Sequence, residues 1–379
     1  MDAKRYLAPR IRADLAHKLV ILTGPRQAGK TTLARQLLAE YPRAQYLNWD
    51  VPADREIIVS GAWSPRAGLV VFDEIHKMRN WKVFLKGAWD GRSPNQAVLV
   101  TGSARMETFR QGGESLAGRY FAWRLHPFSV REAVDSLGMA PTQALDRLVE
   151  RGGFPEPFLA ANDLAARRWR SQYATDLIRE DVLEFSRVHE IRNLQLFVEL
   201  LRERVGSPIK ISSLAQMLQI SPTTATRYLE ILEALYIVFR VTPWHRDVAR
   251  SILKESKVYF FDTGMVRGDA GARLENAVAA MLLKHAHFRQ DGEGKAVTLH
   301  TIRDKEHHEI DFVLAEDNVV TDLIEVKQSD STVSPFFHRM AERFGRARAV
   351  QIVAELRQES QRGRVAVVSA AEWLATLSA

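Results

Sequence analysis

A glycine-rich segment near the N-terminus constrains the fold of this chain more than any other feature. The segment Gly24-Pro-Arg-Gln-Ala-Gly-Lys-Thr-Thr32 matches the pattern G-x-x-x-x-G-K-[ST]. It follows the apolar run Leu19–Leu22 and precedes the helix-like stretch Leu33–Glu40, which is the strand–loop–helix context that a phosphate-binding loop requires. Glycine lets backbone N–H groups face phosphate oxygens without a Cβ clash, and the following helix adds its positive amino end. The segment therefore predicts a nucleotide-binding α/β domain.

Individual positions of this loop have distinct expected roles. Lys30 places a positive charge on the outer phosphates, and Thr31 offers its hydroxyl to Mg²⁺. The expected ligands are therefore ATP and Mg²⁺. The residues that we expect to contact the nucleotide are Gly24, Pro25, Arg26, Gln27, Ala28, Gly29, Lys30, Thr31 and Thr32, together with Ser103 from a later strand.

Two further apolar runs end in polar residues that suit such a site. Leu69–Phe72 leads into Asp73 and Glu74, and Val98–Val100 leads into the tripeptide Thr101-Gly-Ser. Ligands of α/β sheets bind at the carboxyl ends of the strands, so we expect Asp73 to hold Mg²⁺ and Glu74 to orient or deprotonate the attacking water. Thr101 or the serine after it would hydrogen-bond that water or the γ-phosphate. The alternatives are solvated acids at a strand end and a strand that simply runs into a turn.

Three segments of the chain differ in texture, and they predict three domains. Residues 1–130 alternate short apolar runs with helical or loop-length connectors, which is typical of a parallel α/β sheet. Residues 131–250 have a helical pattern, and strands return over residues 251–379. The expected strands are Leu19–Thr23, Gln45–Trp49, Leu69–Phe72, Ala97–Thr101, Tyr120–Leu125, Lys257–Phe261, Thr298–Arg303, Glu309–Ala315 and Val319–Lys327, and the expected loops include Gly268–Gly271 and Asp291–Gly294.

Composition narrows the class of protein. The 379 residues include no cysteine, which excludes disulfides, thiolate metal sites and a cysteine nucleophile, and which fits a reducing cytoplasm. The chain lacks a long apolar run and begins with charged residues, so we expect neither a membrane span nor a secretion signal. Lys and Arg number 53 against 46 Asp and Glu. The resulting charge of +7 permits nucleic acid as a partner but supports it only weakly.

Several motifs together resemble a known family. The phosphate loop and the polar strand ends resemble the AAA+ ATPases, in which the strand with the polar sensor lies between the phosphate-loop strand and the Asp-Glu strand. More narrowly, the chain resembles a widespread bacterial and archaeal group in which an AAA-type ATPase precedes a C-terminal domain of unknown function. The motifs that carry this resemblance are Gly24–Thr32, Phe72-Asp-Glu-Ile-His-Lys77, Thr101-Gly-Ser103, Ser115-Leu-Ala-Gly-Arg119, His126-Pro-Phe-Ser-Val-Arg-Glu132, Gly152-Gly-Phe-Pro155 and Val258-Tyr-Phe-Phe-Asp-Thr-Gly264.

The resemblance implies a role for Arg119, which precedes the fifth expected strand. It would act as an arginine finger on the nucleotide of a neighbouring subunit, where it offsets the charge that develops at the γ-phosphate. Such a role requires a homo-oligomer, for which a hexameric ring is one form. The alternative is a surface arginine that makes a salt bridge.

The helical middle contains a helix–turn–helix pattern. Ser212–Ile220 and Pro222–Tyr236 predict two helices, with Ser221 as the N-cap of the second. Ile237–Val241 then predicts a strand, as the wing of a winged helix would. The segment carries only a small basic surplus, so a protein-docking role is the alternative to DNA binding. In a DNA-binding unit the second helix would enter the major groove, led by Thr223, Thr224, Thr226 and Arg227.

Four charged residues near the C-terminus suggest a second chemical centre. Asp311 lies on one expected strand, and Glu325 and Lys327 share a face of the next, because strand side chains alternate between faces. Asp311 joins them only if the connecting loop has an odd length or a bulge intervenes. Glu275 begins the apolar face of an upstream helix and points toward a sheet.

This arrangement resembles the PD-(D/E)XK nuclease fold. By that resemblance Asp311 and Glu325 would bind Mg²⁺ or Mn²⁺, Glu275 would complete the metal shell, and Lys327 would position or activate water against a scissile phosphate. One alternative is a fold signature that survives without cleavage, and another is an ordinary exposed pair on a strand. The adjacent His307-His308 would point to opposite faces of a strand, so we expect surface residues there rather than metal ligands.

These patterns predict an α/β protein with an AAA+-like P-loop ATPase domain, a helical linker with a winged helix, and a nuclease-like α/β domain. The first hypothesis is a DNA-directed motor or repair ATPase that couples Mg-ATP hydrolysis to handling or cutting DNA. The second is a nucleotide-driven switch whose later domains bind protein partners and cleave nothing.

Overall fold

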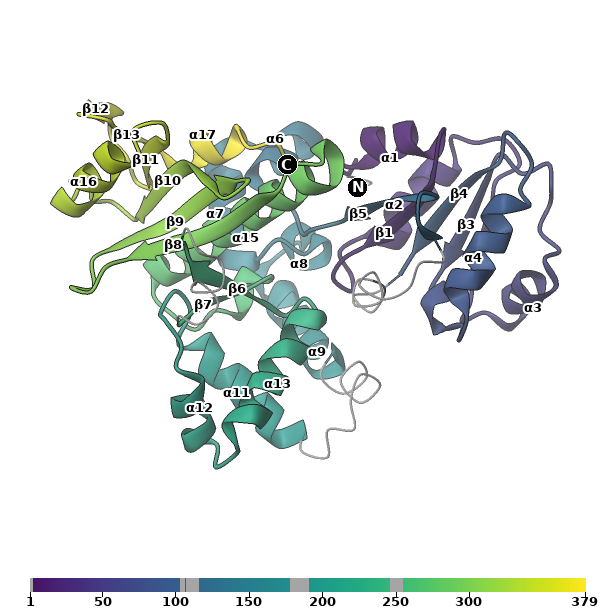
Figure 1. The fold of residues 1–379 in the computed structure, drawn as a ribbon, viewed down its shortest axis with the longest axis horizontal. Helices are drawn as coiled ribbons and strands as arrows, with labels where there is room; N and C mark the ends of the chain where they lie inside the picture. The colour runs from purple at the N-terminus through teal and green to yellow at the C-terminus, as the bar shows by residue number, and fades with distance from the viewer. Residues whose placement is uncertain (1–2, 103–105, 107–115, 178–190, 246–254) are drawn as a thin grey trace. The chain divides into compact units, whose positions relative to one another are not determined.

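The computed structural model describes residues 3–102, 106, 116–177, 191–245 and 255–379 (Figure 1). The chain divides into two compact units, of which the first ends at His126 and the second begins at Pro127. Each unit is built around a sheet of its own. Among the helices of the described ranges, none combines the length and the hydropathy that crossing a membrane requires.

The first unit contains five parallel strands, and each coincides with an expected strand to within one residue at either end. The strands are β1 (Leu19–Thr23), β2 (Gln45–Asn48), β3 (Leu69–Asp73), β4 (Ala97–Thr101) and β5 (Tyr120–Arg124). Their order across the sheet is β2-β3-β4-β1-β5. Since β4 lies between β1 and β3, the strand order implied by the AAA+ resemblance is confirmed.

Helices connect these strands and cover the sheet (Figure 1). They are α1 (Ala8–Leu15), α2 (Lys30–Leu38), α3 (Pro52–Ser60), the short 3-10 helix η1 (Ile75–Lys77) and α4 (Trp81–Asp90). Every residue of β1, β3 and β4 is buried, which explains their uninterrupted apolar sequences. α4 contributes Trp81, Leu85 and Trp89 to the core around Phe72. The parallel strands direct all their carboxyl ends to one edge of the sheet.

The second unit begins with helices and continues into a mixed sheet with the order β12-β13-β11-β10-β9-β8-β6-β7. Its helices are α6 (Val130–Leu137), α7 (Pro141–Arg151), α8 (Pro155–Leu159), α9 (Asp163–Asp176), α11 (Ile191–Arg202), α12 (Ile211–Met217), α13 (Pro222–Ala234), the 3-10 helix η5 (Thr263–Met265), α15 (Ala270–Glu293), α16 (Pro335–Arg343) and α17 (Ala370–Ala375). Its strands are β6 (Val238–Pro243), β7 (Lys257–Phe260), β8 (Val297–Arg303), β9 (Glu309–Glu316), β10 (Val319–Lys327), β11 (Arg348–Val353), β12 (Ser360–Arg362) and β13 (Val365–Ser369).

The helix–turn–helix pattern of the middle segment folds as α12 and α13. Ser221 caps α13, since its hydroxyl accepts a hydrogen bond from the Thr224 N–H at 3.0 Å. β6 follows α13 and pairs antiparallel with β7 at one edge of the sheet. The expected domain boundary at residue 250 therefore falls between two paired strands, and this boundary stays a prediction.

α15 is longer than the sequence pattern predicts. It extends to Glu293 and ends at Gly294, whose φ of 67° supplies the left-handed residue that commonly terminates a helix. The expected loop over Asp291–Gly294 is therefore wrong except at the glycine itself. In Figure 1 this long helix runs along the sheet near β8. By its position in the sequence, Glu275 lies in the second turn of α15.

Candidate functional site

The loop between β1 and α2 has the backbone geometry that a phosphate-binding loop needs. Gly24 and Gly29 have φ angles of 137° and 95°, in the region that favours glycine, and Gln27 has a φ of 59°. A Cβ on Gly24 would lie 2.3 Å from the carbonyl oxygen of Leu125. Only glycine fits here, because it lets the loop lie against the chain that leaves β5.

Lys30 folds back over this loop. Its Nζ donates hydrogen bonds to the carbonyl oxygens of Gly24, at 2.9 Å, and Pro25, at 2.6 Å. The Arg5 guanidinium also braces the loop by donating to the Ala28 carbonyl. These two carbonyl acceptors are neutral, and a charged phosphate oxygen would be the stronger acceptor. Lys30 therefore lies where its ammonium group could exchange these carbonyl oxygens for a phosphate oxygen of a bound nucleotide.

The carboxylate of Asp73, at the end of β3, accepts four hydrogen bonds. Its Oδ2 accepts from the hydroxyls of Thr31, at 3.2 Å, and Tyr46. Its Oδ1 accepts from the Thr101 hydroxyl and, at 3.1 Å, from the Glu74 N–H. Burial, followed by the contact with Asp73, raises the pKa of Tyr46, so the phenol stays protonated and remains a donor. Thr31 and Asp73 are thus placed to hold one cation together.

Glu74 follows Asp73 with a φ of 56°. Its Oε2 lies 3.6 Å from His76 Nε2 and 3.7 Å from Lys77 Nζ. Burial, and then the charge of Asp73, raise the pKa of Glu74 above 4.5. A carboxylate with a raised pKa is the stronger base, which suits the predicted activation of water.

The carboxyl edge of the first sheet therefore brings together the phosphate loop, Asp73, Glu74 and Thr101, as expected. Ser103 lies outside the described residues. Tyr46 of β2 joins the site although no sequence motif singled it out. Its only sequence signal is a hydroxyl-bearing side chain within the short expected strand Gln45–Trp49.

Arg119 lies at the opposite edge of the same sheet. It precedes Tyr120, which pairs with Leu19 at the first position of β1. Its guanidinium contacts the Asp90 carboxylate, with Nε–Oδ1 at 2.9 Å and Nη2–Oδ2 at 3.1 Å. A strand of five residues spans about 16 Å, so Arg119 lies far from the nucleotide site of its own chain. The structure thus contains the ion pair with Asp90. The role of Arg119 as a finger on a neighbouring subunit stays a prediction.

In the second unit a β-bulge assembles the predicted acidic pair. β9 and β10 are joined by Asp317 and Asn318, whose φ angles of 49° and 62° are typical of a two-residue hairpin turn. With this even loop length Asp311 would face away from Glu325. The register shifts by one residue at Thr321, and its continuation brings Asp311 opposite Glu325. A bulge thus meets the condition that the sequence left open.

A lysine that no motif singled out takes part in this cluster. Lys257, on β7 and 2% exposed, pairs with Glu309 and places its Nζ 3.0 Å from Glu275 Oε1. The Tyr259 hydroxyl donates to the same oxygen at 2.7 Å. Burial lowers the pKa of Lys257, but the carboxylates of Glu275, Asp311 and Glu309 raise it by more, so the lysine stays charged. Glu275 already has a cationic partner, and its metal-ligand role stays a prediction.

Asp311 and Glu325 retain unbalanced negative charge. Asp311 Oδ2 accepts a hydrogen bond from the Val326 N–H at 2.8 Å, and Glu325 Oε1 accepts one from Lys327 Nζ at 2.9 Å. The other oxygen of Glu325, Oε2, is buried without a hydrogen-bond partner among the described residues. Burial, and then the charges of Glu325 and Glu275, raise the pKa of Asp311 well above 3.8, and burial also raises that of Glu325. Like-charged carboxylates and an orphaned oxygen fit a hard divalent cation such as Mg²⁺ or Mn²⁺.

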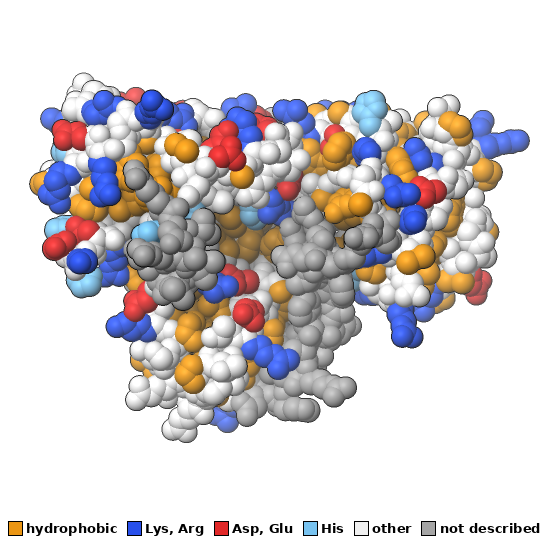
Figure 2. All heavy atoms as spheres, in the orientation of Figure 1, with side chains coloured by type: hydrophobic (Ala, Val, Ile, Leu, Met, Phe, Trp, Pro, Cys, Tyr) orange, Lys and Arg blue, Asp and Glu red, His pale blue; other side chains and the backbone are white. Residues whose placement is uncertain are grey.

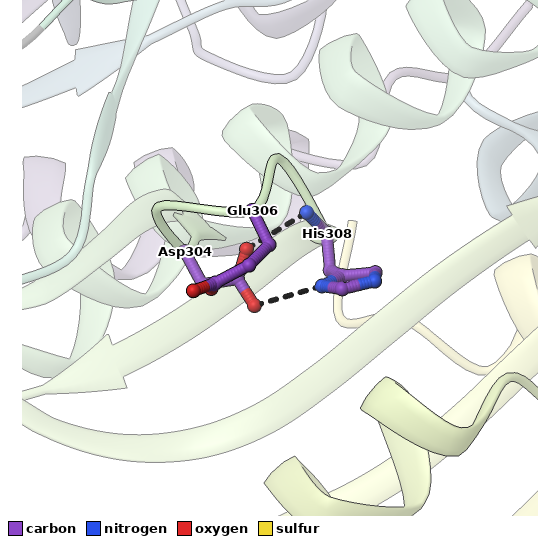
Figure 3. A group of neighbouring side chains, drawn as sticks. All are labelled: Asp304, Glu306 and His308. Carbon is purple, nitrogen blue, oxygen red and sulfur yellow. Dashed lines mark hydrogen bonds and ion pairs between the residues drawn. The ribbon is translucent and has the colours of Figure 1, made fainter.

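A second acidic group lies in the exposed turn between β8 and β9 (Figure 3). The ligand atoms of Asp304, Glu306 and His308 lie within 4.8 Å of one another. The His308 N–H and Nδ1 each lie 2.9 Å from an Asp304 carboxylate oxygen, so these contacts account for the pairing of Asp304 with His308. His307 and His308 are exposed, in agreement with the expectation of surface residues.

Three family models match successive segments of the chain. Residues 16–134 match a model described as an AAA domain. Residues 142–274 match a domain of unknown function, DUF8612, and residues 270–373 match another, DUF4143. The first match contains the phosphate loop, Asp73 and Glu74. Together with the strand order, it indicates an AAA-type P-loop fold that supports ATP binding and hydrolysis.

Relatives of this chain occur in bacteria and archaea. The uncharacterized protein Rv2008c of Mycobacterium tuberculosis is 30% identical over 266 residues, which are 69% of this chain and 58% of that protein. The chain thus spans less than two thirds of this relative. The uncharacterized protein MJ1544 of Methanocaldococcus jannaschii is 22% identical over 337 residues, covering 80% of this chain and 74% of that protein. Among solved structures, the Walker-type ATPase PABY2304 of Pyrococcus abyssi gives a TM-score of 0.48 at 15% identity, over 72% of this chain and 96% of that one.

Proposed function

We propose that this chain is a Mg²⁺-dependent ATPase of the AAA+ type. The observation that carries the proposal is the 3.2 Å contact between Thr31 and Asp73 beside the phosphate loop. When bound, Mg²⁺ supplies positive charge to the outer phosphates, and these two side chains would hold it. Lys30 would exchange its loop carbonyls for phosphate oxygens.

Hydrolysis then depends on Glu74 and Thr101. Glu74 would accept a proton from the attacking water, so that the oxygen of that water bonds to the γ-phosphorus as the bond to the β–γ bridging oxygen breaks. The Thr101 hydroxyl would turn from Asp73 to the γ-phosphate or the water, and Ser103 is the other candidate for this role. ADP and inorganic phosphate are the products.

The direct test is phosphate release with and without Mg²⁺, together with the binding of a fluorescent ATP analogue. We expect Mg²⁺-dependent turnover in the wild-type chain and the loss of binding and turnover in Lys30→Ala. The matched control is Lys18→Ala, a lysine at the opposite edge of the same sheet. Turnover in Lys30→Ala equal to that of the wild type would contradict the proposal.

We further propose that ATP turnover is directed at DNA. Thr223 and Arg227 are exposed on α13, the helix that would enter the major groove. On the visible face, Figure 2 shows Lys and Arg scattered among acidic side chains rather than gathered in one patch. Such a surface predicts modest affinity with a shallow salt dependence. DNA should raise turnover in the wild-type chain and less so in Arg227→Ala, with the exposed Arg357, as Arg357→Ala, for the control.

The C-terminal centre is the site where we propose Mg²⁺- or Mn²⁺-dependent cleavage of DNA. Asp311 and Glu325 would hold the metal, and Lys327 would position the attacking water against the phosphate. A cleft of about 720 Å³ opens beside Lys257, and its lining includes three cationic side chains (Lys257, Arg303, Lys305) and four acidic ones (Glu255, Asp304, Glu306, Glu309). Cleavage of duplex, single-stranded and branched DNA that disappears in Asp311→Asn would support this activity.

A second candidate function is a nucleotide-driven switch that binds protein partners and cleaves nothing. The observation that favours it is Lys257, which neutralises Glu275 and Glu309 within the acidic cluster. DNA would then leave ATP turnover unchanged, and Asp311→Asn would not alter any reaction on DNA. The same two assays therefore separate the two functions.

A further inference from the structure

A buried glutamine lies next to the acidic pair of the second unit. Gln351 of β11 is fully buried, and the parallel register of β10 and β11 pairs it with Glu325. Residues paired in this way project from the same face of a sheet. Asp311, Glu325 and Gln351 therefore form one row across β9, β10 and β11.

The amide of Gln351 has a defined orientation. Its Nε2 donates a hydrogen bond to the Asp330 carbonyl oxygen at 3.1 Å, and a carbonyl can only accept, so the remaining atom is Oε1. Gln351 Oε1 is buried without a partner among the described residues, as is Glu325 Oε2. Buried acceptors are normally satisfied. Two orphaned oxygens on neighbouring strands therefore point to a ligand.

The charges around this row favour a divalent cation over a neutral ligand. Lys257 pairs with Glu275 and Glu309, and Lys327 pairs with Glu325. Four carboxyl groups, Asp311 among them, thus face two ammonium groups. The carboxyl groups outnumber the ammonium groups by two, so a divalent cation would match the excess.

Glu275 is poorly placed for a metal. Its Oε1 accepts from Lys257 and Tyr259, and its Oε2 faces Gly206, where an added Cβ would lie 2.9 Å away. Glu275, Asp311 and Glu325 are also not among the described groups whose ligand atoms converge within 4.8 Å. One oxygen of Glu275 thus already has an ammonium and a hydroxyl as partners.

We propose that the cation of this centre is bound by Asp311, Glu325 and Gln351 Oε1, while Lys257 acts as a tethered cation beside Glu275 in place of a metal. The inference rests on the metal centre proposed above and changes its ligands. Two carboxylates and a neutral amide oxygen form the oxygen-only donor set that Mg²⁺ and Mn²⁺ prefer. Lys257 limits the wild-type centre to one divalent ion.

The test is Mn²⁺ binding to the full chain without nucleotide, followed through the electron paramagnetic resonance of free Mn²⁺. Every variant carries Asp73→Asn, which removes the metal ligand of the first unit. We expect one Mn²⁺ per chain in this parent. Gln351→Leu should weaken binding about tenfold, whereas Glu275→Gln should change it by less than about twofold. Gln351→Glu, which adds a charged oxygen, should strengthen it.

Lys257→Met tests the second half of the proposal. Removing the ammonium leaves Glu275 and Glu309 without a counter-charge, so this variant should bind a second Mn²⁺. Glu275→Gln in the Lys257→Met background should abolish that gain. Melting temperatures check that each variant is folded, and Gln351→Met, which keeps the side-chain volume, replaces Gln351→Leu if the latter unfolds.

The outcomes separate the inference from the proposed centre. If Asp311→Asn abolishes binding but Gln351→Leu leaves it unchanged, the centre stands and the ligand assignment is wrong. If Glu275→Gln weakens binding as much as Asp311→Asn does, Lys257 does not replace a metal. If the parent binds no Mn²⁺, or if Asp311→Asn leaves binding intact, the centre and the inference both fail.

Discussion

The two carboxylate centres of this molecule balance their charge in opposite ways. Asp73 accepts hydrogen bonds from three hydroxyls and one N–H, and Lys30 is held by backbone carbonyls. In the second unit Lys257 and Lys327 lie directly against carboxylates. Neutral donors can be exchanged for Mg²⁺ and phosphate in each cycle, whereas a buried lysine is a permanent counter-charge. The first centre therefore suits a ligand that is exchanged in each catalytic cycle, and the second suits a ligand that remains bound.

The largest expected loss of ATP turnover tests whether an arginine from a neighbouring subunit completes the nucleotide site of the first unit. Arg119→Ala should lower turnover roughly a thousandfold and spare nucleotide binding, because a finger stabilises only the transition state. Asp90→Ala removes the same exposed ion pair and is the control. Turnover near the wild-type value in Arg119→Ala, or an equal loss in both variants, would contradict the finger role. Arg119 would then serve only in the surface ion pair with Asp90.

Glu74→Gln should lower turnover roughly a hundredfold while ATP binding persists, because the amide cannot accept a proton from water. Glu56→Gln, in the same unit, is the control. Since burial raises the pKa of Glu74, wild-type turnover should rise with pH through a value above 4.5 and level off once the carboxylate is ionised. A turnover that is independent of pH over this range would argue against Glu74 as the base.

The second centre should make the stability of its unit depend on pH. Burial raises the pKa values of Asp311 and Glu325, so from about pH 4 up to their folded-state pKa values the folded state binds more protons than the unfolded state. The free energy of unfolding should therefore fall as pH rises through this window, and Mg²⁺ should restore it. Chemical denaturation followed at several pH values measures the slope, and Asp311→Asn should flatten it. If the free energy of unfolding of the wild type rose with pH in this window, and that of Asp311→Asn did not, this charge balance would be contradicted.

The smallest effect concerns Tyr46. Its hydroxyl withdraws charge from Asp73, so Tyr46→Phe should lower the Mg²⁺ concentration for half-maximal turnover about threefold, as expected for one hydrogen bond. Tyr6→Phe, in the same unit, is the control. A higher Mg²⁺ requirement would mean that Tyr46 positions Asp73 rather than competing with the metal.

The first centre could be predicted from sequence because its parts are local. A strand, a loop with glycines and a helix follow one another within Leu19–Leu38, and Asp73 and Glu74 end an apolar run. Parallel strands bring such ends to one edge whatever their spacing in the chain. The contact of Tyr46 with Asp73 could not be predicted, because it depends on which strand pairs with β3 and no local pattern sets the strand order.

The second centre depends on contacts that a linear pattern does not contain. The bulge at Thr321 decides that Asp311 faces Glu325, and nothing in the hairpin sequence reveals it. Lys257 is the first residue of an otherwise apolar strand, and nothing in the local sequence marks it. It balances the charge of Glu275 only because β7 and α15 pack together. Gln351 joins the row through a parallel pairing with β10 across an intervening helix. Its signal is a lone amide within the apolar run that follows Arg348 in β11.

One titration tests the difference between the two centres most directly. Mn²⁺ ions bound per wild-type chain are counted with and without a non-hydrolysable ATP analogue. We expect one ion without nucleotide, at Asp311 and Glu325, and a second only with nucleotide, at Thr31 and Asp73. The second ion should disappear in Lys30→Ala and the first in Asp311→Asn. The same number of ions with and without the analogue would contradict the account.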